Sequence, residues 1–71
     1  MRLSTRNQLT GTITEVTLGA VMATVKVRLD GGDQIVTASI TKDAAMDLGL
    51  EVGKPATVLI KSTEVMIGVD G

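Results

Sequence analysis

Apolar and polar residues alternate with a period of two through the first half of the chain, which is the spacing of a β-strand with one buried face. The strongest alternation predicts a strand over residues 21–29, with one face made of Val21, Ala23, Val25, Val27 and Leu29. Residues 30–33 read Asp-Gly-Gly-Asp, and two central glycines tolerate the positive φ angles of a type I′ or II′ turn. The sequence therefore predicts a hairpin into a further strand over residues 34–41.

A strand over residues 9–18 is also predicted, but its alternation changes phase part-way along. The odd-numbered positions up to Ile13 share one face, whereas the apolar positions from Val16 onward lie on the other. This change of phase predicts a β-bulge near Glu15. Gly19 marks the reversal into the next strand, so the first three strands are expected to form an antiparallel meander.

A short helix of about two turns is predicted over residues 41–49. Thr41 is a suitable N-cap, alanines follow it, and a glycine stands at the end of the segment. Ala44 and Leu48 are four residues apart, so we expect both to face the sheet.

The last third of the chain reads as extended again after Gly53-Lys54-Pro55, because proline disfavours helix in the residue before it. A strand is predicted over residues 57–62, followed by a last strand over 64–69 or a continuation of the same strand beyond a bend. Four to six short strands with one helix are typical of a small, partly open barrel of the oligonucleotide/oligosaccharide-binding (OB) type. The predicted fold is all-β, with residues 1–71 forming one domain.

The composition limits how this domain can be stabilised. Apolar residues make up 44% of the 71 positions, but Phe, Tyr, Trp, Cys and His are all absent. The core must therefore be built from small aliphatic side chains, and a chain this short buries only about 60% of its unfolded surface. Disulfides are excluded, and a zinc site would lack its preferred ligands. We therefore expect the chain to assemble as an oligomer.

Several classes of function are disfavoured by the same residues. No histidine can serve as a base and no cysteine as a nucleophile, and the adjacent Lys61 and Ser62 on an extended strand would point to opposite faces, so the chain is predicted not to be an enzyme. The net charge of −1 and the lack of aromatic residues argue against nucleic acid as a partner. Lys26 and Arg28 share a strand face and are read as solubilising charges. No membrane span or secretory signal is seen, so a cytoplasmic location is expected.

Polar donors gather just before the first strand, in Ser4-Thr5-Arg6-Asn7-Gln8, and again at Lys61-Ser62-Thr63. Hydroxyl, amide and guanidinium groups are the donors that a tetrahedral oxyanion needs when it leaves water. The residues alone also allow a simpler interpretation, in which Arg6 is a solvated terminal residue and Lys61 extends its charge from a strand end.

Four segments taken together resemble the molbindins, the small molybdate-binding Mop proteins of the TOBE-like type. They are Ser4 to Gly11, Leu18 to Val21, Asp47 to Leu50 with Val52-Gly53, and Ile60 to Ile67. The resemblance runs from Met1 to about Ile67. It implies an OB-like fold, intracellular binding and storage of molybdate or tungstate as an intact oxyanion, no organic cofactor, and no protein atom bonded to the metal. It also implies a homohexamer, a trimer of dimers, that holds its anions between subunits.

By this resemblance, one class of oxyanion site uses Ser4, Arg6, Lys61 and Ser62, with the backbone N–H of Thr5 as a donor and Asn7 supporting the loop. A second, weaker class involves the turn Gly19-Ala20-Val21, where backbone N–H groups form an anion nest. The sequence departs from the commonest family pattern at Thr5, where alanine is frequent, and at Met22, where polar residues also occur. The competing hypothesis is a non-enzymatic β-barrel that oligomerises or docks on another protein without a small-molecule ligand.

Overall fold

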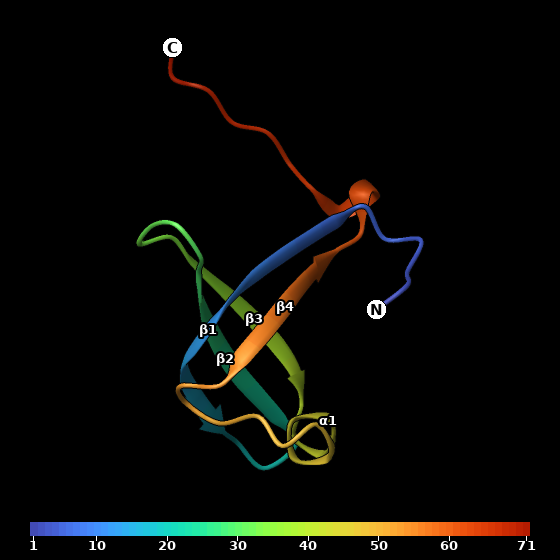
Figure 1. Ribbon diagram of the computed structural model, residues 1–71, viewed down its shortest axis with the longest axis vertical. Coiled ribbons are helices and arrows are strands. Elements are labelled where there is room, and N and C mark those ends of the chain that lie inside the picture. Colours follow the sequence, from blue (N-terminus) through green and yellow to red (C-terminus); the bar gives the residue numbers. More distant parts are fainter.

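Four antiparallel strands form one strongly curled sheet, an open half-barrel, in the order β3-β2-β1-β4 (Figure 1). The computed structural model describes residues 1–71. The strands are β1 (Asn7–Leu18), β2 (Met22–Leu29), β3 (Ile35–Thr41) and β4 (Pro55–Ile60). The predicted mostly β architecture with one short helix is confirmed, and the first three strands form the predicted meander.

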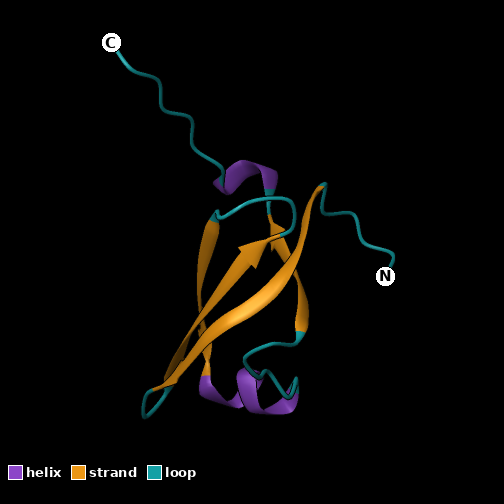
Figure 2. Ribbon diagram, turned by 60° about the vertical axis from the view of Figure 1, so that its left-hand side comes forward, coloured by secondary structure: helices purple, strands orange, loops and turns teal.

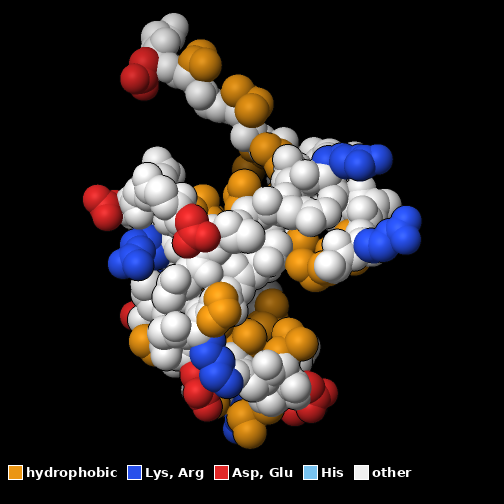
Figure 3. Space-filling model, viewed as in Figure 1, with side chains coloured by type: hydrophobic (Ala, Val, Ile, Leu, Met, Phe, Trp, Pro, Cys, Tyr) orange, Lys and Arg blue, Asp and Glu red, His pale blue; other side chains and the backbone are white.

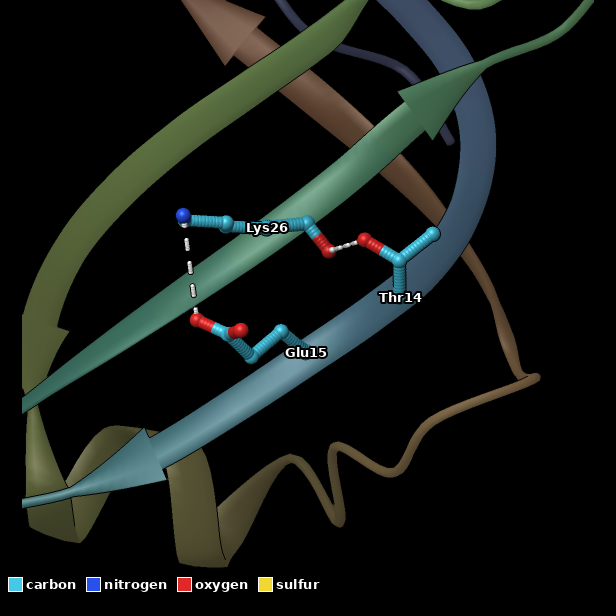
Figure 4. A network of polar contacts seen from close by, with 3 residues as sticks. All are labelled: Thr14, Glu15 and Lys26. Atoms are coloured by element: carbon cyan, nitrogen blue, oxygen red, sulfur yellow. Dashed lines mark hydrogen bonds and ion pairs between the residues drawn. The ribbon is translucent and has the colours of Figure 1, made fainter.

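The predicted bulge lies in the middle of β1. Ile13 is paired with Val27, but the next pair is Glu15 with Lys26, which leaves Thr14 as the extra residue. The Thr14 hydroxyl donates to the Lys26 carbonyl at 3.3 Å, and the Lys26 Nζ lies 3.9 Å from the Glu15 carboxylate (Figure 4). A bulge bends its strand and increases the local twist, which here allows the long β1 to follow the curl of the sheet.

The hairpin between β2 and β3 is confirmed, but its loop is wider than a two-residue turn. The Leu29 N–H donates to the Gln34 carbonyl at 2.8 Å, so residues 30–33 all lie in the loop. Only Gly31 has a positive φ, at 86°, so the second central glycine is not required to adopt one.

The turn between β1 and β2 spans Gly19 to Val21 and depends on the first of these residues. The Gly19 N–H donates to the Met22 carbonyl at 2.8 Å, and a Cβ at position 19 would lie 2.9 Å from that oxygen. The predicted start of the strand at Val21 was wrong. Val21 belongs to this turn, and its side chain is 71% exposed.

The helix α1 (Lys42–Asp47) follows β3 without a break. Thr41 is extended and its hydroxyl accepts the Ala44 N–H at 3.1 Å, which confirms the predicted N-cap. The predicted buried face was wrong by one position, because Ala45 is buried whereas Leu48 is 70% exposed. Leu48 is the C-cap residue, and the chain closes the helix there through bonds from the Gly49 and Leu50 N–H groups to the Met46 and Ala45 carbonyls.

Strand β4 begins two residues earlier than predicted, at Pro55, and ends at Ile60 rather than at residue 62. Pro55 is tolerated because β4 is an edge strand and pairs only with β1, where its partner is Thr12. Residues 62–64 then form a single 3-10 turn, η1 (Ser62–Glu64).

The predicted last strand over 64–69 was wrong for a single chain. Val65–Gly71 runs away from the sheet, as Figures 1 and 2 show, and makes no backbone hydrogen bond beyond the one from the Val65 N–H to the Ser62 carbonyl. A strand needs a neighbouring strand, and none lies beside this segment in its own chain.

The core is as thin as the composition predicts. Only six of the 71 residues are buried, and the central cluster consists of Ile13, Val25 and Val27, with Val16, Ile40, Leu50, Ala56 and Val58 packed around it. The structure contains no helix with the length and hydrophobicity that crossing a lipid bilayer requires.

Candidate anion site

The first candidate site forms where the beginning of β1 meets the end of β4. Asn7 is paired with Ile60 across the two strands, and the Asn7 side-chain amide donates to the Ile60 carbonyl at 3.1 Å. Arg6 directly precedes Asn7 and Lys61 directly follows Ile60, so both flank the last pair of the two strands. Two cations that are 55 positions apart in sequence are thus brought to the same end of the half-barrel by one strand pairing.

The lead-in to β1 is held in place by Gln8. Its side-chain amide donates to the Thr5 carbonyl at 2.7 Å, which closes a tight loop over four residues. The backbone N–H groups of Thr5 and Arg6 have no acceptor within the chain, and Thr5 is half-buried whereas Ser4 and Arg6 are exposed. The loop therefore presents free donors.

The second half of this site lies at the corner between β4 and η1. Lys61 is extended and stands at the N-cap of the turn, where its carbonyl accepts the Glu64 N–H at 2.9 Å. The chain leaves the direction of β4 where this turn begins, at Ser62, and the side chains of Lys61 and Ser62 are both exposed. The corner and the Ser4–Arg6 loop therefore lie next to each other through the pairing of Asn7 with Ile60.

Neither Arg6 nor Lys61 has a carboxylate partner. The ion pairs of the chain are Lys26 with Glu15 at 3.9 Å and Lys54 with Glu51 at 3.6 Å, and both lie elsewhere. Figure 3 shows blue side chains at the upper right of the molecule, on the side of the N-terminal segment. Uncompensated cations beside free hydroxyl and N–H donors attract an anion and can form charge-assisted hydrogen bonds to it.

A single chain nevertheless provides only part of an anion cavity. Ser4, Arg6, Lys61 and Ser62 are all exposed, so solvent reaches the cluster from one side. Charge-assisted hydrogen bonds to an anion are much weaker in water than in a site that excludes it. A surface from another molecule would have to cover this cluster for the anion to be desolvated.

The second predicted cluster, Gly19-Ala20-Val21, lies at the opposite end of β1. The strand between the two clusters contains 12 residues, so the path along it is about 40 Å at ~3.3 Å per residue. The Gly19 N–H is already bonded to Met22, which leaves the N–H groups of Ala20 and Val21 without an acceptor. The structure therefore does not bring the two clusters together within a chain, and the turn offers two free backbone donors rather than three.

Sequence reasoning did not find two roles that the structure assigns. The Gln8 side chain holds the Thr5 loop through its bond to the Thr5 carbonyl. The spacing of three residues between Thr5 and Gln8 is the sequence feature that could have indicated this local side-chain to backbone bond. The Lys42 N–H donates to the Val21 carbonyl at 2.8 Å and so ties the start of α1 to the Gly19–Val21 turn. That bond joins residues 21 positions apart, and no local sequence pattern indicates it.

Comparison with known proteins places this geometry in a family. Residues 3–67 match the TOBE domain. The chain is 40% identical over 70 residues to a probable molybdenum-pterin-binding protein of Haemophilus influenzae, covering 99% of this chain and all of that protein. It is 46% identical over 67 residues to molybdenum-pterin-binding protein 3 of Clostridium pasteurianum, covering 94% and 97%. The chain belongs to the TOBE family, and within it to the Mop proteins.

Solved Mop structures share the whole fold. MopII from Clostridium pasteurianum superposes with a TM-score of 0.89 at 35% identity, covering 96% of this chain and all of the other. The cytoplasmic molybdate-binding protein ModG, in a crystal form with molybdate bound, gives a TM-score of 0.91 at 44% identity. This Mop chain is covered to 99% in that comparison and spans about half of ModG, at 49%. Mop proteins are binding proteins and not enzymes, as predicted.

Proposed function

We propose that this Mop protein binds molybdate, or tungstate, as an intact oxyanion between the subunits of a homo-oligomer and so buffers the anion in the cytoplasm. The observation that carries the proposal is the pairing of Asn7 with Ile60, which brings the flanking residues Arg6 and Lys61 to one end of the half-barrel with no carboxylate partner for either. A structure with molybdate bound that is 44% identical to this chain supports the choice of anion.

Each residue of the first site has a proposed part. Arg6 and Lys61 supply charge, Ser4 and Ser62 supply hydroxyl donors, and Thr5 supplies its free backbone N–H. Asn7 does not face the anion directly. Its amide is bonded to the Ile60 carbonyl, so it fixes the spacing between the two halves of the site.

The exposure of this cluster supports a site between subunits. In the proposed homohexamer, a trimer of dimers, a second chain excludes water from the donors and adds its own. The turn Gly19-Ala20-Val21, with its two free N–H groups, is the proposed second and weaker class of site.

The proposed ligand is the inorganic anion, although several relatives are named for molybdenum-pterin. Pockets for organic ligands such as a pterin are lined mainly by hydrophobic and aromatic side chains, and this chain contains no aromatic residue. Selection against sulfate would rest on the size of the cavity and the placement of donors, because both anions are tetrahedral dianions. Molybdate and tungstate are close in size, so we expect little discrimination between them.

Native mass spectrometry after dialysis against molybdate, with sulfate and a pterin as parallel ligands, tests the proposal. We expect a hexamer that gains several molybdates and no sulfate or pterin. Arg6→Ala should weaken one class of site about ten- to a hundredfold through loss of a charge-assisted bond. Arg28→Ala is the matched control, since Arg28 is also exposed and has no ion pair but lies on β2, paired with Thr12. Unchanged molybdate binding by Arg6→Ala would refute the site.

Thermal unfolding provides an independent measurement. A ligand that binds only the folded assembly stabilises it by about 2.7 kcal/mol per site at a hundredfold excess over the dissociation constant. A melting temperature that molybdate does not move would contradict the proposal.

The second candidate function is a β-barrel module that oligomerises or docks on a protein without a small ligand. The many exposed aliphatic side chains favour it, since only five hydrophobic residues are buried. In the same experiment an oligomer that stays free of molybdate would support this alternative.

A further inference from the structure

The ladder between β2 and β3 ends with a single hydrogen bond instead of a pair, at the point where α1 begins. The Lys42 N–H donates to the Val21 carbonyl at 2.8 Å, but the Val21 N–H donates to no acceptor in the chain. Opposed residues that bond in an antiparallel ladder normally exchange both bonds. Lys42 is the first residue of α1, so the chain leaves the ladder before the second bond forms. A free backbone donor therefore lies next to Lys42.

Lys42 also carries a charge that no carboxylate compensates. The two ion pairs of the chain use Lys26 and Lys54. The backbone bond to Val21 holds residue 42 beside the turn that joins β1 and β2, as Figure 1 shows for α1 as a whole, and the Lys42 side chain is half-buried. Because lysine carries its ammonium on a flexible four-carbon stem, the stem can pack on the protein while the charge stays in solvent.

No other side chain of the same molecule is placed to supply charge to this turn. The arginines that precede β1 and the lysine that follows β4 lie at the opposite end of the half-barrel. Arg28 lies at the far end of β2, next to the loop into β3. Met22 directly follows the turn, but a thioether has no N–H or O–H to donate. A charged donor at this turn must therefore come from Lys42.

We propose that the Lys42 ammonium is the charged donor of the second oxyanion site, where it binds the anion together with the free N–H groups of Ala20 and Val21. The inference deepens the proposed function and rests on it. A hydrogen bond from a charged donor is roughly twice as strong as one between neutral groups. An ammonium acts as a point charge and imposes no planar geometry, so the two backbone N–H groups orient the anion and Lys42 supplies most of its affinity.

Lys42→Gln tests this role, because it removes the charge and keeps both the backbone bond and a good helix former at the start of α1. By calorimetric titration with molybdate we expect the weaker class of site to lose affinity about ten- to a hundredfold, while the class that depends on Arg6 is unchanged. Lys42→Arg should restore most of the binding. Arg28→Gln is the matched control and should leave both classes unchanged, since Arg28 is exposed and has no ion pair.

A second measurement uses the wild-type protein and covers the case in which Lys42→Gln does not fold. In a nuclear magnetic resonance titration with molybdate, the Ala20 and Val21 amide signals and the Lys42 side-chain signals should shift together with one dissociation constant. Amide signals that shift while the Lys42 side chain does not, or a Lys42→Gln protein with wild-type affinity at both classes, would overturn the role of Lys42 and leave the proposed function standing. A wild-type protein that binds no molybdate would overturn both.

Discussion

Gly11 is the position where the structure allows least room for a side chain. It lies in β1, is buried, and is paired with Leu29 on one side and Ala56 on the other. A Cβ at this position would lie 2.3 Å from the Arg28 carbonyl oxygen and 2.7 Å from a methyl group of Val27. Ordinary contacts begin near 3.4 Å, so the substitution Gly11→Ala must push the two strands apart by about 1 Å.

Overpacking of this kind costs about 1–3 kcal/mol, and we place Gly11→Ala at the upper end because the closest atom belongs to the backbone. For a domain of this size each kcal/mol lowers the melting temperature by about 4–8 °C, so a fall of about 10–20 °C is expected. The assay is thermal unfolding followed by circular dichroism, at one fixed protein concentration because assembly contributes to stability.

Gly32→Ala is the control for this prediction. Gly32 has no atom within 4 Å of an added Cβ and does not adopt a positive φ, so the alanine should be neutral or slightly stabilising. A Gly11→Ala protein with the same melting temperature as wild type would refute the steric reasoning and the pairing of β1 with β2 on which it rests.

Substitutions at three further positions test other parts of the fold. Thr41→Ala should lower the unfolding free energy by about 1 kcal/mol through loss of the N-cap, and Thr41→Ser should restore most of it in a urea titration. Ile13→Ala should lower the unfolding free energy by about 2–5 kcal/mol and Ile13→Val by only about 0.5–1.5 kcal/mol, because Ile13 is the most buried large side chain. If the two variants lost equal stability in a urea titration, the result would contradict the position of Ile13 in the centre of the core. Lys26→Ala should change stability by less than about 1 kcal/mol, because its ion pair with Glu15 is long and exposed, and a larger loss on thermal unfolding would show that the pair matters more.

The sequence allowed much of the sheet to be predicted, since its period-two pattern reports which face of a strand is buried. The bulge followed from the change of phase before Val16, and the helix from the Thr41 cap. Errors arose where tertiary contacts decide the outcome. Ala45 rather than Leu48 is buried where α1 contacts β2 and β3, and residues 64–69 have no strand partner within the chain.

The candidate site was predictable in its residue types but not in its geometry. Resemblance named Arg6 and Lys61, yet their adjacency depends on the pairing of Asn7 with Ile60, which joins the two ends of the chain. Neither composition nor local spacing carries that long-range register. The locking of Thr5 by Gln8 likewise becomes visible only in three dimensions.

The pairing of Asn7 with Ile60 also has a consequence for how such domains can be joined in one polypeptide. It brings the segments that enter β1 and leave β4 to the same end of the half-barrel (Figure 1). In a head-to-tail fusion of two copies, the connection would therefore follow the C-terminal segment and leave the sheet of each copy, so no strand pairing within a copy would be broken. The fold is in this sense suited to tandem repetition, in which one gene product supplies two units of an assembly.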